Sequence, residues 1–154
     1  MDLRTHLHIR ETAHTLYGFA TEEERAESAA QMVNSQDAAV AAALREAQEE
    51  TGLGQEYVDV LGTMPPYETS TGFSVTPVAS LVRPGFTLVA DAFEVAEIFE
   101  VPLAFLMDPA NHRLYQATTP DGRTRQYYAM PWEGHFIWGA TAGMLRNFYR
   151  FMQA

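Results

Sequence analysis

The sequence predicts one α/β domain of the α+β kind, in which helices lie on the faces of a mixed β-sheet. The chain has 154 residues, of which 47% are hydrophobic and 12% aromatic, so it can build one domain with a hydrophobic core. Helix-period and alternating apolar patterns follow one another along it. They do so without strict strand–helix–strand alternation, so we expect a mixed sheet in a single domain spanning residues 1–154.

The first helical pattern is in a polar part of the chain. Residues 21–33 are rich in Ala and Glu and include Arg25, and these residue types favour a helix. We predict a helix there and treat residues 1–35 as an atypical N-terminal segment.

A stronger helix is predicted over the stretch DAAVAAALREAQEETGL. Asp37, or alternatively Ser35, can cap its first turn, and Val40 and Leu44 fall on its buried side. Gly52 should end it, because glycine readily adopts the left-handed conformation found after many helices.

Two strands are expected next. Residues 56–64 alternate apolar and polar side chains, which predicts a half-buried strand. The stretch PPYETSTG supplies a turn to a second strand, FSVTPVASLVR, in which Pro77 favours a sheet edge or a bulge.

The last part of the chain should alternate strands and helices. A strand is expected from Phe93, followed at Pro102 by the first turn of a short helix through Leu106. Residues 112–130 surround a Pro-Asp-Gly turn and predict a hairpin. Residues 135–153 predict a C-terminal helix. The residues that fall at helical spacing are Ile137, Thr141, Met144, Leu145, Phe148 and Met152.

The charge of the chain limits its partners. The net charge is -10, every basic residue is an arginine, and no basic cluster is visible, so nucleic acid is not expected as a partner. The absence of cysteine excludes disulfides, thiolate zinc sites and cysteine nucleophiles. No secretion signal or membrane span is apparent, so we expect a cytoplasmic protein.

Three glutamates crowd one side of the second predicted helix. Glu46, Glu49 and Glu50 have the i, i+3, i+4 spacing that places side chains on one helical face. Like charges so close repel one another. Either the face is well hydrated, or a hard divalent cation makes the crowding favourable.

The same stretch resembles the second half of the Nudix signature, Arg-Glu-aliphatic-x-Glu-Glu-x-Gly-aliphatic. The matching residues are Arg45, Glu46, Ala47, Glu49, Glu50, Gly52 and Leu53. The resemblance implies the family's α/β/α sandwich and hydrolysis of a nucleoside diphosphate linked to another group. In the first half of the signature Asp37 stands at the family's glutamate and Gln31 at its glycine.

Further stretches look like the coenzyme A diphosphatase branch, over about residues 36–150. They are PPYETSTGFSVTPV, EVAEIFEVPLAFLMDPANH and HFIWGATAGML. The resemblance implies a substrate similar to coenzyme A, cleaved to phosphopantetheine and adenosine bisphosphate. The alternative is a catalytically impaired Nudix-fold protein that binds a nucleotide or acts only as a folded domain.

The resemblance also implies roles for particular residues. Mg²⁺ or Mn²⁺ would be bound by Glu46, Glu49 and Glu50. Arg45 would hold the glutamates by ion pairing, and Glu94, or Glu97 in its place, would bind metal or deprotonate water. Glu49, Glu94 and Arg45 are therefore the expected catalytic residues. The carbonyl of Ala30 would stand where the family has a further metal ligand.

Other residues have a simpler interpretation beside a functional one. His6, His8 and His14 have a suggestive spacing but are more typical of a polar surface than of a zinc site. Tyr67, Phe73 and Trp138 could stack a nucleobase, although aromatic residues more often belong to a core.

The opening segment lacks the Phe-Pro-Gly-Gly loop that precedes the helix in this branch. Either the segment has been remodelled, or it is read in a shifted frame that rejoins the ancestral one near Asp37. If it supplies no strand, a sheet edge stays exposed, and pairing in a homodimer is one way to cover it.

Translating the gene in the other two frames tests the shifted-frame hypothesis. If the segment is read in a shifted frame, one of them should encode Phe-Pro-Gly-Gly upstream of the codon for Asp37. If neither frame encodes this sequence, the hypothesis is excluded and the segment is a remodelled one.

Overall fold

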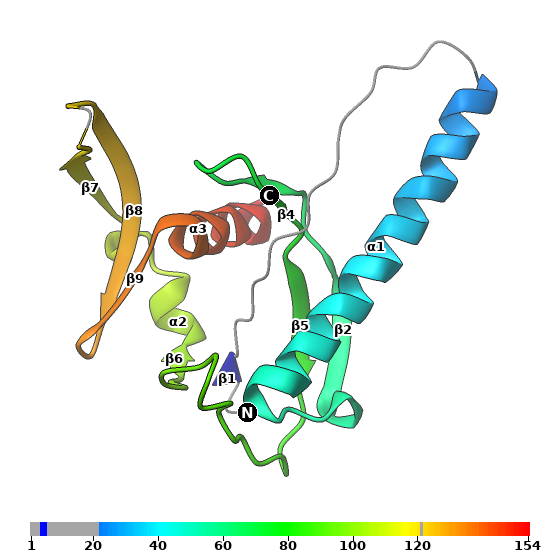
Figure 1. The fold of residues 1–154 in the computed structure, drawn as a ribbon, viewed down its shortest axis with the longest axis horizontal. Helices are drawn as coiled ribbons and strands as arrows, with labels where there is room; N and C mark the ends of the chain where they lie inside the picture. The colour runs from blue at the N-terminus through cyan, green and yellow to red at the C-terminus, as the bar shows by residue number, and fades with distance from the viewer. Residues whose placement is uncertain (1–3, 6–21, 121) are drawn as a thin grey trace. The chain divides into compact units, whose positions relative to one another are not determined.

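The computed structural model describes residues 4–5, 22–120 and 122–154, with side chains from residue 35 onward. Their contacts form two compact units. Residues 22–98 belong to the first, and residues 99–154 belong to the second together with strand β1 (Arg4–Thr5). Helices and antiparallel strands both occur (Figure 1), which confirms the α+β class, and every described strand pair is antiparallel.

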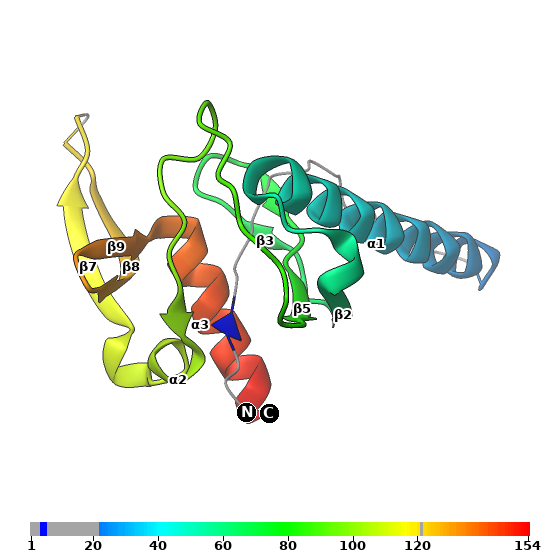
Figure 2. The same ribbon diagram turned by 90° about the horizontal axis from the view of Figure 1, so that it is seen from below.

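The first unit is built on helix α1 (Glu22–Thr51), which lies along the strand pair β2–β5 in both Figure 1 and Figure 2. A 3-10 turn η1 (Gln55–Tyr57) leads into β2 (Val58–Thr63). The short strands β3 (Tyr67–Glu68) and β4 (Ser74–Val75) form a hairpin, and β5 (Val78–Val82) returns beside β2.

Helix α1 is continuous, so the predicted start at Asp37 or Ser35 is wrong. The helix predicted over residues 21–33 and the following one are a single helix. Nothing between them breaks the pattern, because the connecting residues include neither glycine nor proline. Gly52 ends the helix as predicted, with φ +69° and its N–H donating to the Gln48 carbonyl at 2.9 Å.

The first strand predicted after the helix is present as β2, and it pairs with β5 with a register shift between Val60 and Gly62. The second, predicted as one strand over residues 73–83, is instead divided into β4, which pairs with β3, and β5. Pro77, predicted to mark an edge or a bulge, lies between them, where its missing N–H interrupts the pairing. Arg83 extends this pairing, because its guanidinium lies 3.2 Å from the Asp59 carboxylate and also donates to the Glu56 carbonyl.

The strand predicted from Phe93 does not form. Residues 83–100 connect the units without regular strand structure, and only Val101–Pro102 pair, as β6 with β1. The backbone of this segment instead bonds to the end of α1: Val89 N–H donates to the Thr51 carbonyl at 2.9 Å, and Asp91 N–H to the Glu50 carbonyl at 2.8 Å. Within the predicted strand itself, the N–H groups of Phe93 and Val95 donate to the Asp91 carboxylate and carbonyl, so they are not available to a neighbouring strand.

The second unit combines a three-stranded sheet with two helices. Helix α2 (Leu103–Leu106) follows Pro102 at its N-cap, one position from the prediction, and leads to η2 (Pro109–Asn111). The predicted hairpin is formed by β7 (Arg113–Thr118) and β8 (Thr124–Trp132). Strand β9 (His135–Trp138) continues the sheet, and α3 (Gly139–Gln153) ends the chain.

The prediction that the C-terminal helix begins at His135 is wrong. Residues 135–138 pair with β8, and α3 begins only at Gly139, whose φ of +65° lets the chain change direction at the end of the strand. Ile137 therefore belongs to the strand. The helical spacing of Met144 and Leu145 is confirmed, because both are buried where α3 faces β8.

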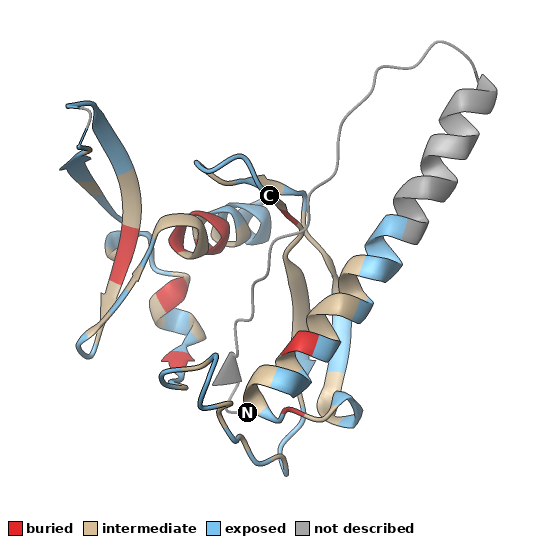
Figure 3. Ribbon diagram, viewed as in Figure 1, coloured by how far each residue is buried: buried red, intermediate tan, exposed pale blue. Residues whose placement is uncertain are grey.

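The core of the second unit lies between α3, α2 and one face of the sheet, where Figure 3 shows buried residues. Its buried members are Val101, Leu106, Met130 and Leu145. Arg146 of α3 lies 4.3 Å from the ring centre of Tyr128, which extends the contact along β8. Among the described helices, none is long and apolar enough to cross a membrane.

Replacing Met130 with Ala should destabilise the protein by about 2–5 kcal/mol, because a fully buried side chain leaves a cavity. Urea unfolding followed by circular dichroism measures the change. The matched control is Met152→Ala, at a side chain 60% exposed, which should change stability by less than about 0.5 kcal/mol. Equal effects of the two variants would contradict this assignment of the core.

Candidate functional site

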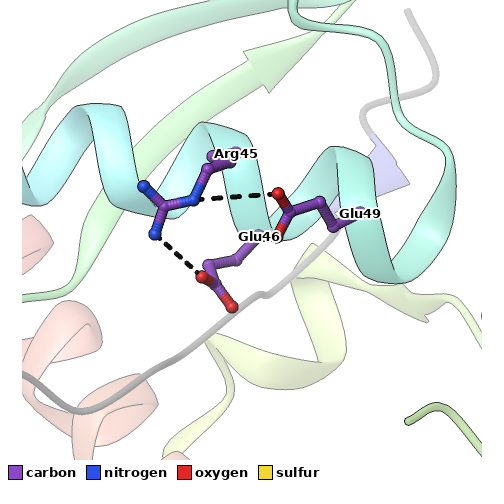
Figure 4. Close-up of polar contacts among 3 residues, drawn as sticks. All are labelled: Arg45, Glu46 and Glu49. Atoms are coloured by element: carbon purple, nitrogen blue, oxygen red, sulfur yellow. Dashed lines mark hydrogen bonds and ion pairs between the residues drawn. The ribbon is translucent and has the colours of Figure 1, made fainter. Parts of the chain in front are cut away.

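The acidic face of α1 is organised around Arg45. Its Nη2 lies 3.0 Å from Oε1 of Glu46, and its Nε lies 3.9 Å from Oε1 of Glu49. Figure 4 shows the guanidinium between the two carboxylates. One guanidinium therefore lies within ion-pair distance of two carboxylates, and the catalytic role of Arg45 stays a prediction.

The two glutamates differ in exposure. Glu46 is 6% exposed, whereas the side chain of Glu49 is 61% exposed. A buried carboxylate needs hydrogen-bond and charge partners, which Arg45 supplies for Glu46. The Glu49 pair is exposed and longer than a hydrogen bond, so it adds little stability and leaves this carboxylate accessible.

A backbone hydrogen bond attaches the loop that carries Glu94 to the last turn of α1, at Glu50. Glu50 is half-buried in the last turn of α1, and its carbonyl accepts from the Asp91 N–H. Asp91 then forms a tight turn, because its Oδ1 accepts from the Phe93 N–H at 2.7 Å and its carbonyl accepts from the Val95 N–H at 2.8 Å. Glu94 is exposed in this turn, so the loop that carries it is fixed to the end of the glutamate helix.

Gly52 allows this contact. Its φ of +69° suits glycine, and an added Cβ would lie 3.4 Å from the Val89 backbone nitrogen. The glycine of the signature therefore ends the helix and also lies against the loop that leads to Glu94. Glu97 is exposed farther along the same segment.

The predicted metal ligands are adjacent but do not converge on one point. Among the described side chains, no group of three or more His, Asp or Glu residues is placed to hold a metal ion. The donor set still fits a hard divalent cation, since Glu46 and Glu49 are oxygen ligands that already share one cationic group. The assignment of Glu46, Glu49 and Glu50 to a metal stays a prediction.

The upstream part of the signature lies inside α1. Ala30 and Gln31 are helical, and in an α-helix each carbonyl accepts from the N–H four residues on. The Ala30 carbonyl is therefore committed to the helix and is not available as a ligand. His6, His8 and His14 lie outside the described residues.

The three aromatic residues considered for base stacking are distributed over both units. Tyr67 is half-buried and Phe73 is 44% exposed in the first unit, and Trp138 is 59% exposed in the second. The bonds from the Val89 and Asp91 N–H groups to the helix end were not predicted. Their only signal in the sequence is the Asp-x-Phe turn, which does not indicate the carbonyl groups that accept them.

Comparison with known proteins identifies the family. The profile of the NUDIX domain matches residues 10–120. The chain belongs to the Nudix family. The match includes the glutamate helix, the loop fixed to it and strand β7 of the second unit.

Curated relatives support the same conclusion. A protein of Citrobacter koseri named "Uncharacterized Nudix hydrolase NudL" is 39% identical over 119 residues, which is 75% of this chain and 60% of the relative. Proteins with the same name from Cronobacter sakazakii and Salmonella newport are 40% and 38% identical over 109 and 116 residues. These matches cover 70% and 75% of this chain. The chain spans 56% and 60% of those two relatives. Nudix hydrolases generally need divalent metal ions.

Replacing Gly52 with Ala should destabilise the protein by about 1–2 kcal/mol, because a residue with a Cβ is strained at this φ. Gly52→Asn should cost less, since asparagine tolerates the left-handed conformation. Urea unfolding of both variants measures the difference. If alanine proves as stable as glycine, the helix end does not depend on this conformation.

Proposed function

We propose that this chain is a divalent-metal-dependent hydrolase that cleaves a P–O–P linkage in a small nucleoside diphosphate-linked substrate. The observation that supports this most is the Arg45 guanidinium between Glu46 and Glu49 on the signature helix of a Nudix family member. A water molecule would attack phosphorus, and the bond to the leaving phosphate would break.

The proposed metal ligands are Glu46, Glu49 and Glu50, and the ions would be Mg²⁺ or Mn²⁺. When bound, such an ion polarises the phosphoryl group, lowers the pKa of water and neutralises charge on the leaving phosphate. Since the chain has a net charge of -10, positive charge at the site is needed to hold an anionic substrate.

The protein side chains would divide the remaining work. Glu46 is buried and paired with Arg45, so its carboxylate would be held in one orientation as a metal ligand. Glu49 is accessible enough to accept a proton from the attacking water. Glu94 is the second candidate for that role, because its loop is bonded to the helix end, and Glu97 is the third.

Coenzyme A or a derivative is the proposed substrate. The proposal is supported by the stretches PPYETSTGFSVTPV and HFIWGATAGML, which resemble the coenzyme A diphosphatase branch. The products would be phosphopantetheine and adenosine bisphosphate. A cytoplasmic location and a homodimer are part of the same proposal.

A catalytically impaired Nudix-fold protein is the second candidate. It is favoured by the continuous α1, in which Gln31 occupies the place of the signature glycine and the Ala30 carbonyl is bonded within the helix. If the family's ligand from this backbone position is essential, the chain would bind nucleotide without cleaving it.

Turnover of coenzyme A with Mn²⁺ or Mg²⁺ distinguishes the two candidates. We expect phosphopantetheine and adenosine bisphosphate by chromatography and mass spectrometry. Glu49→Gln should lower kcat/KM by about 10²-fold or more, because it removes a charged ligand and a proton acceptor.

The matched control is Glu56→Gln, which removes an exposed carboxylate from η1 in the same unit, outside the stretches that support the substrate, and should leave turnover unchanged. A second measurement is thermal stabilisation by Mn²⁺, expected in the wild type and lost in Glu49→Gln. No turnover, with Mn²⁺ stabilising both proteins alike or neither, would favour the impaired candidate.

A further inference from the structure

One face of the sheet in the second unit carries an aromatic cluster away from the core. Its four rings are Tyr115, Tyr127, Phe136 and Trp138. Tyr115 and Tyr127 stack with centroids 5.9 Å apart, Phe136 meets Tyr115 edge-on at 5.4 Å, and Trp138 meets Tyr127 edge-on at 5.6 Å. We call this set the aromatic platform.

The strand register separates the platform from the hydrophobic core. Residues directly opposite in paired strands, and residues two apart in one strand, share a face. Ala129 pairs with Trp138 and lies two residues from Tyr127, so all three share one face. Met130, next in β8, points to the opposite face, where Leu145 of α3 belongs to the same core cluster.

The platform is open to solvent at its edge and closed at its centre. Trp138 is 59% exposed and Phe136 is 46% exposed, whereas Ala129 is fully buried. Ala129 lies on the central strand β8, and its small side chain leaves room for rings on the flanking strands β7 and β9 to lean together, which accounts for the contact between Tyr115 and Phe136. The result is a preassembled aromatic surface whose outer rings are accessible.

Two arginines share this face. Arg113 pairs with Ala129, and Arg125 pairs with Ala117 and lies two residues from Tyr127. Both arginines are exposed. Strands β7, β8 and β9 contain no Asp or Glu, so no strand carboxylate competes for them. In a chain of net charge -10, this face therefore combines positive charge with exposed rings.

We propose that the aromatic platform binds a small nucleotide, with its base stacked on Trp138 and its phosphate held by Arg113 or Arg125. Base stacking uses the exposed face of an aromatic ring, and guanidinium groups are suited to phosphate oxygens. A ligand with both a ring and an anion matches the platform better than an apolar partner, which would leave the arginines without counter-charge. The proposal goes beyond hydrolysis and does not require metal ions.

Fluorescence tests the proposal directly, because the chain has only two tryptophans. Trp132 packs on Phe105 with centroids 4.6 Å apart, on the core face. In the full chain carrying Trp132→Phe, the remaining signal comes from Trp138. AMP, titrated in the presence of EDTA, should quench the Trp138 fluorescence saturably. Adenosine has only the base and inorganic phosphate has only the anion, so each should bind more weakly than AMP.

Variants test the contacts to the base and to the phosphate of AMP separately. Calorimetric titration should show that Trp138→Ala weakens AMP binding about tenfold and Trp138→Phe less, because phenylalanine keeps a ring. Arg113→Gln with Arg125→Gln should also weaken it about tenfold. Trp138 makes no side-chain cap to α3, so helix formation should survive its replacement, which circular dichroism checks.

Matched controls lie on α3 of the same unit. Phe151→Ala removes an exposed ring and Arg150→Gln an exposed guanidinium, and neither should change AMP binding. Absence of saturable quenching, or equal loss in the controls and the platform variants, would overturn the proposal. Tighter binding of an eight-residue thymidine oligonucleotide than of AMP would also overturn it, in favour of single-stranded nucleic acid.

The Glu49→Gln variant keeps this test independent of catalysis. It should bind AMP in EDTA as the wild type does, since it leaves the platform intact. Turnover without AMP binding would reject the platform and retain the proposed hydrolase. AMP binding without turnover would retain the platform and reject the proposed hydrolase.

Discussion

The first unit depends on how the last carbonyl groups of α1 find hydrogen-bond donors. A helix leaves its final carbonyls without partners inside the helix. Here the backbone N–H groups of Val89 and Asp91 supply donors to Thr51 and Glu50, and Gly52 gives the chain the sharp change of direction that admits them. This arrangement links two segments about 40 residues apart in sequence and brings the loop with Glu94 to the end of the acidic helix.

Local patterns predicted the elements whose stability is local. The hairpin of β7 and β8 follows from alternating residues around a Pro-Asp-Gly turn, and the end of α1 follows from Gly52. The start of α1 could not be predicted from local patterns. Asp37 is a good cap in isolation, but the preceding alanine- and glutamate-rich residues favour a helix equally well, and the backbone continues through it.

Elements that depend on distant partners were harder to predict. The apolar residues after Phe93 resemble a strand. However, the Asp91 N–H bonds to the helix end, and the Phe93 and Val95 N–H groups bond to Asp91 in a turn. Residues 135–138 fit a helical period, but they pair with β8 as a strand, and Gly139 lets the chain change direction after them. The acidic face itself was predictable because helical spacing alone places Glu46 beside Glu49. The burial of Glu46 depends on the neighbouring segments and was not predictable.

Phe93 is 99% exposed, in the segment that joins the two units. A bulky aromatic side chain in such a position is a preferred cleavage point for chymotrypsin. Its own N–H is bound to the Asp91 carboxylate, so the turn must open before the protease can extend the backbone into its active site. A single cut there would leave α1 and strands β1 to β5 on one fragment and β6 to β9 with α2 and α3 on the other, so the β1–β6 strand pair would join two separate polypeptides.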